Sequence, residues 1–172
     1  MAMIDIQALT KCFGPKTAPK TAVDGFSLAV EPGEVFGLLG PNGAGKSTLI
    51  KMLTTLLPAS GGRATIAGFD LGRQRVDVQR RIGYVPQALS VDGTLTGYEN
   101  LLILAKLYGV PRRQRLERIQ AALTYVGLDS VARKTMWELI LQLRRDYGTT
   151  VFLTTHFMEE EADVLCDRIA ML

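Results

Sequence analysis

The sequence has two cysteines, one histidine and no long apolar run. Cys12 and Cys166 lie far apart without the spacing of metal ligands, so neither a zinc site nor a disulfide framework is indicated. The longest apolar runs, such as LLILA at 101–105, are far too short to cross a membrane, and the N-terminal stretch MAMIDIQALTK lacks a signal-peptide pattern. These absences predict a cytoplasmic protein that reaches a membrane only through a partner.

Charge and composition indicate the number of domains and the kinds of partner to expect. The 172 residues are 47% hydrophobic and 22% charged, which is ordinary for one globular domain, here predicted as 1–172. The net charge of +3 is spread along the chain, except for the basic stretch GVPRRQRLER at 109–118. We interpret that stretch as the solvated face of a helix rather than as a nucleic-acid or lipid surface, so no nucleic-acid partner is expected.

The most informative stretch is LLGPNGAGKSTL at 38–49, which fits the pattern G-x-x-x-x-G-K-[ST]. The apolar run at 35–39 predicts a buried strand before it, and leucines at helical spacing predict a helix after it, as far as Pro58. Glycines at 40, 43 and 45 permit backbone angles that a side chain forbids, so successive amides can converge on phosphate oxygens. A glycine-rich surface turn is the alternative, and the flanking strand and helix disfavour it.

The side chains of this loop predict its ligands. Lys46 would place a positive charge against the β and γ phosphates of ATP, and the Ser47 hydroxyl would be one ligand of a bridging Mg²⁺ ion. The expected cofactors are therefore ATP and Mg²⁺. The predicted nucleotide-binding residues of the loop are Gly40, Pro41, Asn42, Gly43, Ala44, Gly45, Lys46, Ser47 and Thr48.

Elsewhere, strand and helix patterns alternate, which predicts an α/β protein with a parallel sheet. Strands are expected at 4–9, on both sides of a Pro-Gly turn within 25–40, at 61–70, at 81–87 where Pro86 ends the strand, and at 149–156. Helices are expected from 97, with a break at Pro111, from 112 to 126, and from 130 to 148.

In this order the pieces resemble the ATP-binding subunit of ABC transporters, across almost the whole chain. The loop as GPNGAGKST has the form that this family uses, and LSVDGTLTGYENL and DSVARKTMWELI are similar to its drug-export, daunorubicin-resistance-like type. The resemblance implies a P-loop NTPase fold of ABC type, with a parallel sheet flanked by helices, an antiparallel β subdomain and a helical subdomain at 88–128. It also implies a membrane-spanning permease subunit and a second ATP-binding subunit as partners, at the inner face of the plasma membrane.

The resemblance assigns roles to three residues outside the loop. Phe13 in LTKCFG stands where the family has an aromatic residue that stacks on adenine, although a core position in the first sheet is the alternative. Gln87 in IGYVPQ would bind Mg²⁺ and sense the γ-phosphate, although a buried-polar or turn role remains open. His156, the only histidine, would donate a hydrogen bond to the γ-phosphate, although a lone histidine after a strand is often incidental.

The chain departs from the family pattern in one region. Neither an SGGQ-like signature nor an apolar strand ending in Asp-Glu is present, and the nearest acids, Asp70 and Asp129, follow no convincing strand. The phrase YVGLDSVARKT at 125–135 resembles two family phrases fused, so we expect an internal deletion with its junction near 128–130. ATP binding is then expected to survive and hydrolysis to be impaired. The alternatives are a non-hydrolysing nucleotide-binding module, a gene remnant, or a soluble ABC protein of translation or repair.

Overall fold

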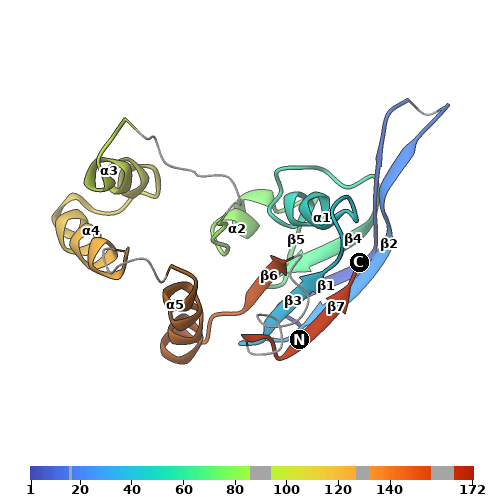
Figure 1. The fold of residues 1–172 in the computed structure, drawn as a ribbon. Coiled ribbons are helices and arrows are strands. Elements are labelled where there is room, and N and C mark those ends of the chain that lie inside the picture. The colour runs from blue at the N-terminus through green and yellow to red at the C-terminus, as the bar shows by residue number, and fades with distance from the viewer. Residues whose placement is uncertain (16, 86–93, 127–131, 156–164) are drawn as a thin grey trace. The chain divides into compact units, whose positions relative to one another are not determined.

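The computed structural model describes residues 1–15, 17–85, 94–126, 132–155 and 165–172. The chain divides into two compact units, one of residues 1–84 with 137–172 and one of residues 85–136 (Figure 1). The first unit holds the phosphate loop and both sheets, and the second is helical.

The first sheet of this unit is antiparallel and has the strand order β2-β1-β4-β5. Alternating side chains explain why the N-terminal part of β1 forms a strand: Ile4 and Ile6 point into the core, where they are 8% and 1% exposed. A register shift after Ile6, with Ala8 at a φ of 47°, moves Leu9 to the buried side, which strict alternation would not. The strands are β1 (Ile4–Phe13), β2 (Lys20–Val30), β4 (Gly61–Ile66) and β5 (Phe69–Asp70).

The second sheet is parallel, with β3 (Val35–Leu39) between β6 (Val151–Thr155) and β7 (Arg168–Met171). All five residues of β3 are buried, as expected for a central strand covered on both faces. Figure 1 shows the three strands running together, and the C-terminal end of β3 leads directly into the phosphate loop. The antiparallel sheet and β3 share one hydrophobic core with the helix that follows the loop.

That helix, α1 (Lys46–Leu53), is shorter than expected, because the leucine spacing predicted a helix as far as Pro58. The hydroxyl of Thr54 donates to the carbonyl oxygen of Ile50 at 2.8 Å, and Thr55 follows in the left-handed region at a φ of 61°. Leu56 is consequently 63% exposed instead of continuing the buried face of the helix. The short helix α2 (Arg75–Gln79) was not expected at all.

The strand expected at 81–87 is wrong for its described part, because residues 82–85 form no strand and Val85 is 85% exposed. An apolar run becomes a strand only beside a partner that completes its backbone hydrogen bonds. Within the described residues β6 pairs with β3 alone, so the sheet continues no further toward this segment. Direct pairing of 82–85 with β6 is therefore excluded.

The second unit confirms the expected helices α3 (Gly97–Leu107) and α4 (Arg112–Val126), and α5 (Ala132–Tyr147) begins within it. Thr96 caps α3: its hydroxyl accepts from the Glu99 amide, and the Glu99 carboxylate accepts from the Thr96 amide at 2.8 Å. In the part of the chain that the structure describes, no helix has both the length and the hydropathy to cross a membrane.

Candidate nucleotide-binding site

The phosphate loop connects the C-terminal end of β3 to the N-terminus of α1 through left-handed glycines. Gly43 and Gly45 have φ values of 89° and 100°, which only glycine adopts without strain. The Ala44 amide donates to the carbonyl oxygen of Pro41 at 3.2 Å, closing a turn, and the Leu49 amide donates to the Gly45 oxygen at 2.8 Å as the helix begins. The loop therefore has the strand-to-helix context that the motif requires.

Gly45 is required for a second reason, which is its contact with the neighbouring sheet. A Cβ atom at this position would lie 2.3 Å from the carbonyl oxygen of Ala22 and 3.3 Å from Cγ2 of Val23, both in β2. At Gly43 a Cβ atom would meet nothing within 4 Å. Gly45 therefore permits close packing of the loop on β2, whereas Gly43 serves the backbone angle alone.

The N-terminus of α1 presents unused hydrogen-bond donors. Among the described residues, the backbone amides of Lys46, Ser47 and Thr48 donate to no protein acceptor. The first turn carries no acidic residue that would compete for them. Free amides at the positive end of a helix form a binding site for anions such as phosphate.

The side chain of Lys46 folds back over the loop. Its ammonium donates to the carbonyl oxygen of Pro41 at 2.8 Å and to that of Gly40 at a shorter distance. A phosphate bound at the amides would compete for this ammonium, and the loop carbonyls hold it in place beforehand. The hydroxyl of Ser47 is exposed at the first turn of the helix. It is a suitable single oxygen ligand for Mg²⁺, whose other ligands in such sites come from phosphate and water.

A cluster of acidic metal ligands is absent from the described part of the chain. Within the described ranges, no group of three or more His, Cys, Asp or Glu residues is close enough to hold a metal. Asp70 lies in β5, in the other sheet, and its Oδ1 accepts from the amides of Gly72 at 2.8 Å and Arg73 at 2.9 Å. This carboxylate stabilises a turn, so its rejection as the strand acid is consistent with the structure. Asp129 lies outside the described residues.

Of the residues outside the loop, Phe13 is described, whereas Gln87, His156 and the junction at 128–130 lie outside the described residues. Phe13 is the last residue of β1, and its side chain is 43% exposed. The core position that sequence analysis left open is therefore excluded. The ring is available to a ligand, and its role in binding adenine stays a prediction.

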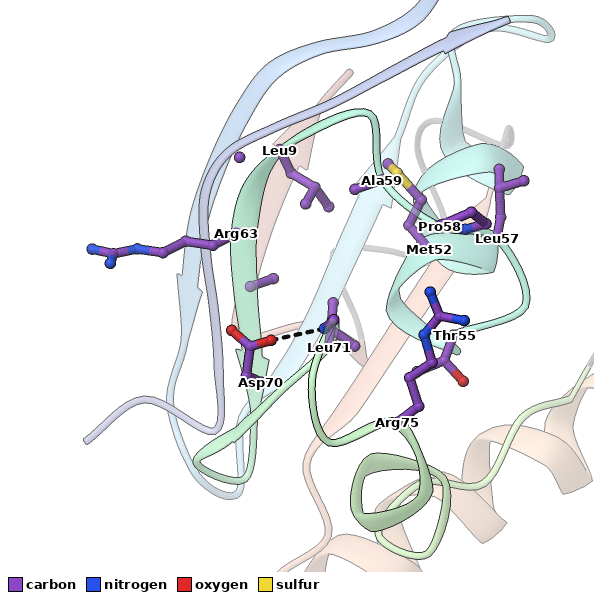
Figure 2. Close-up of a pocket in the computed structure, with 13 residues that line it drawn as sticks. Leu9, Met52, Thr55, Leu57, Pro58, Ala59, Arg63, Asp70, Leu71 and Arg75 are labelled. Carbon is purple, nitrogen blue, oxygen red and sulfur yellow. Dashed lines mark hydrogen bonds between the residues drawn. The ribbon is translucent and has the colours of Figure 1, made fainter.

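A cavity of about 220 Å³ lies between α1 and the β4–β5 hairpin. Figure 2 shows the residues that line it. Leu9, Met52, Leu57 and Leu71 are among its apolar lining residues, and none of its 13 lining residues belongs to the phosphate loop. Pro58 lines the same cavity. The cavity thus lies at the C-terminal end of α1, whereas the phosphate loop lies at the N-terminal end of that helix.

Sequence reasoning missed one charged cluster in the first unit, at the N-terminal end of β3. Glu34 is 8% exposed, its carboxylate accepts from the Glu31 amide at 2.7 Å, and the Arg168 guanidinium lies 3.1 Å from its Oε1. Beside it, Oδ2 of Asp167 accepts from the Val35 amide at 2.8 Å. Arg168 and Asp167 are more than a hundred residues from Glu34 and Val35 in the chain, so no local pattern could have indicated these two pairs.

Comparison with known proteins places these features in context. The sequence model of a protein family described as ABC transporter matches residues 23–144. A linearmycin resistance ATP-binding protein of Bacillus subtilis (strain 168) is 33% identical over 211 residues, covering 99% of this chain and 66% of that protein. A daunorubicin resistance ATP-binding protein of Streptomyces coeruleorubidus is 37% identical over 207 residues, covering 96% of this chain and 62% of that protein.

The lengths of the relatives and of the alignments differ from the length of this chain. The chain spans less than two thirds of each of these relatives. The aligned stretches of 211 and 207 residues also exceed the 172 residues of the chain, so the relatives carry residues that lie opposite gaps in it.

A solved structure agrees on the fold. A dimeric ATP-binding cassette in a post-hydrolysis state, bound to ADP and Pi, matches with a TM-score of 0.84 at 19% identity, covering 99% of this chain and 94% of that one. The predicted fold class, a P-loop NTPase of ABC type, is confirmed.

Proposed function

Because the chain belongs to the ABC transporter family, we propose that it binds Mg-ATP at the phosphate loop as the ATP-binding subunit of a membrane exporter. The observation that carries the proposal is the set of amides at the start of α1 that donate to no acceptor among the described residues, with the Lys46 ammonium held on the carbonyl oxygens of the same loop. Both favour a polyanion such as the triphosphate of ATP. The drug-resistance names of the relatives favour export over import.

The proposed assembly has three parts. A membrane-spanning permease would carry the substrate, as the family membership of the chain favours. A second ATP-binding subunit would close over the loop, as the dimeric state of the matching structure suggests. The chain would then act in the cytoplasm, at the inner face of the plasma membrane. We further propose that Phe13, Gln87 and His156 contact the base, the metal ion and the γ-phosphate, respectively.

We propose that hydrolysis by this chain is slow. Phosphoryl transfer in P-loop enzymes needs a strand Asp for the Mg²⁺ ion and a group that orients water, and the sequence has no apolar strand ending in Asp-Glu. Loss of general-base assistance alone costs about 10²- to 10⁴-fold in rate. The extra residues of the relatives support an internal deletion, whose position near 128–130 stays a prediction from the sequence. The second candidate, a nucleotide-binding module without turnover, rests on the same observation.

Calorimetric titration of the purified chain with Mg-ATP tests the binding proposal. The chain should bind, Lys46→Ala should abolish most of the heat, and Lys51→Ala should bind as the unchanged chain does. Lys51 is the matched control because it is an exposed lysine of the same helix. Absence of heat for the unchanged chain, or equal binding by both variants, would refute the site. Phosphate release at a rate ordinary for an intact cassette would refute impaired hydrolysis while leaving binding in place.

A further inference from the structure

Phe13 does not stand alone at the end of β1. The ammonium of Lys11 lies over its ring, 5.2 Å from the centroid, within the range of a cation–π contact. The two residues are separated by one position on the same strand. One face of the ring therefore carries a positive charge, while the side chain as a whole remains 43% exposed.

Lys11 is itself held in place by the segment that follows α1. Its Nζ donates a hydrogen bond of 2.7 Å to the carbonyl oxygen of Pro58. Pro58 is packed at the cavity shown in Figure 2, beside the end of α1. The lysine thus connects the ring on β1 to the helix that begins at the phosphate loop, and it restricts the positions that an exposed aromatic side chain can adopt.

We propose that Lys11 is a positioning residue of the base site: it holds the Phe13 ring from one face so that the other face is ready to stack on a planar nucleobase. The inference rests on the proposed function, because it assumes that the triphosphate binds at the loop. The ligand class is a purine or pyrimidine nucleoside triphosphate. Fixing the ring before binding reduces the ordering that binding requires, and affinity rises accordingly.

The test separates the base from the phosphates. Binding of Mg-ATP and of Mg-tripolyphosphate, which has no base, is measured by calorimetry for the unchanged chain, Lys11→Met and Phe13→Leu. Lys11→Met should weaken ATP binding about threefold, the size of an exposed cation–π contact, and leave tripolyphosphate binding unchanged. Lys20→Met is the matched control, because Lys20 lies opposite Phe13 across the β1–β2 ladder and brings the same charge to the same region.

A double-mutant cycle shows whether Lys11 acts through the ring. In the Phe13→Leu background, Lys11→Met should cause no further loss of ATP affinity, and Lys11→Arg, which keeps a cation on the ring, should bind ATP as the unchanged chain does. Equal weakening of ATP and tripolyphosphate, equal effects of Lys11→Met and Lys20→Met, or additive losses in the cycle would each overturn the proposal. Thermal melts of every variant identify a loss of ATP affinity that comes from unfolding. If Lys11→Met is unfolded, ATP binding by Lys11→Arg becomes the test, and weaker binding than that of the unchanged chain overturns the proposal.

The two proposals fail differently. If the unchanged chain binds tripolyphosphate as tightly as ATP, the base contributes nothing and only this inference falls. If it binds neither, both fall.

Discussion

Replacing Gly45 by alanine should be much more destabilising than replacing Gly43 by alanine, although both glycines are left-handed. Each substitution places a side chain at a positive φ, of 100° and 89°, which costs about 1–2 kcal/mol. Only at Gly45 does the new Cβ atom also meet backbone, 2.3 Å from the carbonyl oxygen of Ala22. A Cβ atom essentially never approaches another atom closer than 3.0 Å, so α1 or β2 must move.

That movement disturbs a packed core, because α1 and β2 both contribute to the cluster of buried residues that contains Val23 and Leu49. Overpacking of this kind costs about 1–3 kcal/mol in addition to the backbone strain. Gly45→Ala is therefore expected to lose about 2–5 kcal/mol and Gly43→Ala about 1–2 kcal/mol. Against a total stability of about 5–15 kcal/mol, the first loss shifts the transition strongly.

Urea denaturation without nucleotide measures the difference, since ligand binding would otherwise add to the apparent stability. The midpoint should fall in the order unchanged chain, Gly43→Ala, Gly45→Ala, with similar slopes. Gly25→Ala provides a control outside the loop, because Gly25 has a φ of 57° and open space at its Cβ position. If Gly45→Ala unfolds at the same urea concentration as Gly43→Ala, the contact between the loop and β2 is not as described.

Two further predictions concern charges. Arg168→Met should lower the free energy of unfolding by up to about 3 kcal/mol, because it leaves the buried Glu34 carboxylate without its cation. Glu34→Gln should lower it less, because the amide keeps the shape of the side chain and removes the charge, and equal urea midpoints for the two variants would contradict this. Hydrogen bonds from the backbone amide and then the hydroxyl of Thr96 lower the pKa of Glu99, so the stability that they add to α3 is present above the ordinary carboxyl pKa and lost as the pH falls through the folded one. Helical circular dichroism between about pH 6 and pH 3 should therefore decline less for Glu99→Gln than for the unchanged chain, and identical acid titrations would rule this contribution out.

Most of the helices and strands could be predicted because their signals are local. The alternation of Ile4 and Ile6 and the continuous apolar run of β3 each involve residues within a few positions of one another. The end of α1 and the absence of a strand at 82–85 could not be predicted in this way. The helix α1 ends at Leu53, and Thr55 adopts a left-handed φ of 61° that the leucine spacing does not indicate. A strand needs a neighbour that periodicity does not supply.

The candidate site likewise has residues that the sequence predicted and contacts that only the structure shows. The glycine spacing, Lys46 and Ser47 follow from the order of residues alone, because a phosphate loop is formed by consecutive amides. Only the tertiary structure places Ala22 against Gly45 and Arg168 against Glu34. It also places the Lys11 ammonium over the Phe13 ring, where it donates a hydrogen bond to the carbonyl oxygen of Pro58. Apart from Lys11 and Phe13, these groups are brought together by folding over long separations in the chain, and such contacts leave no periodic or local trace in the sequence.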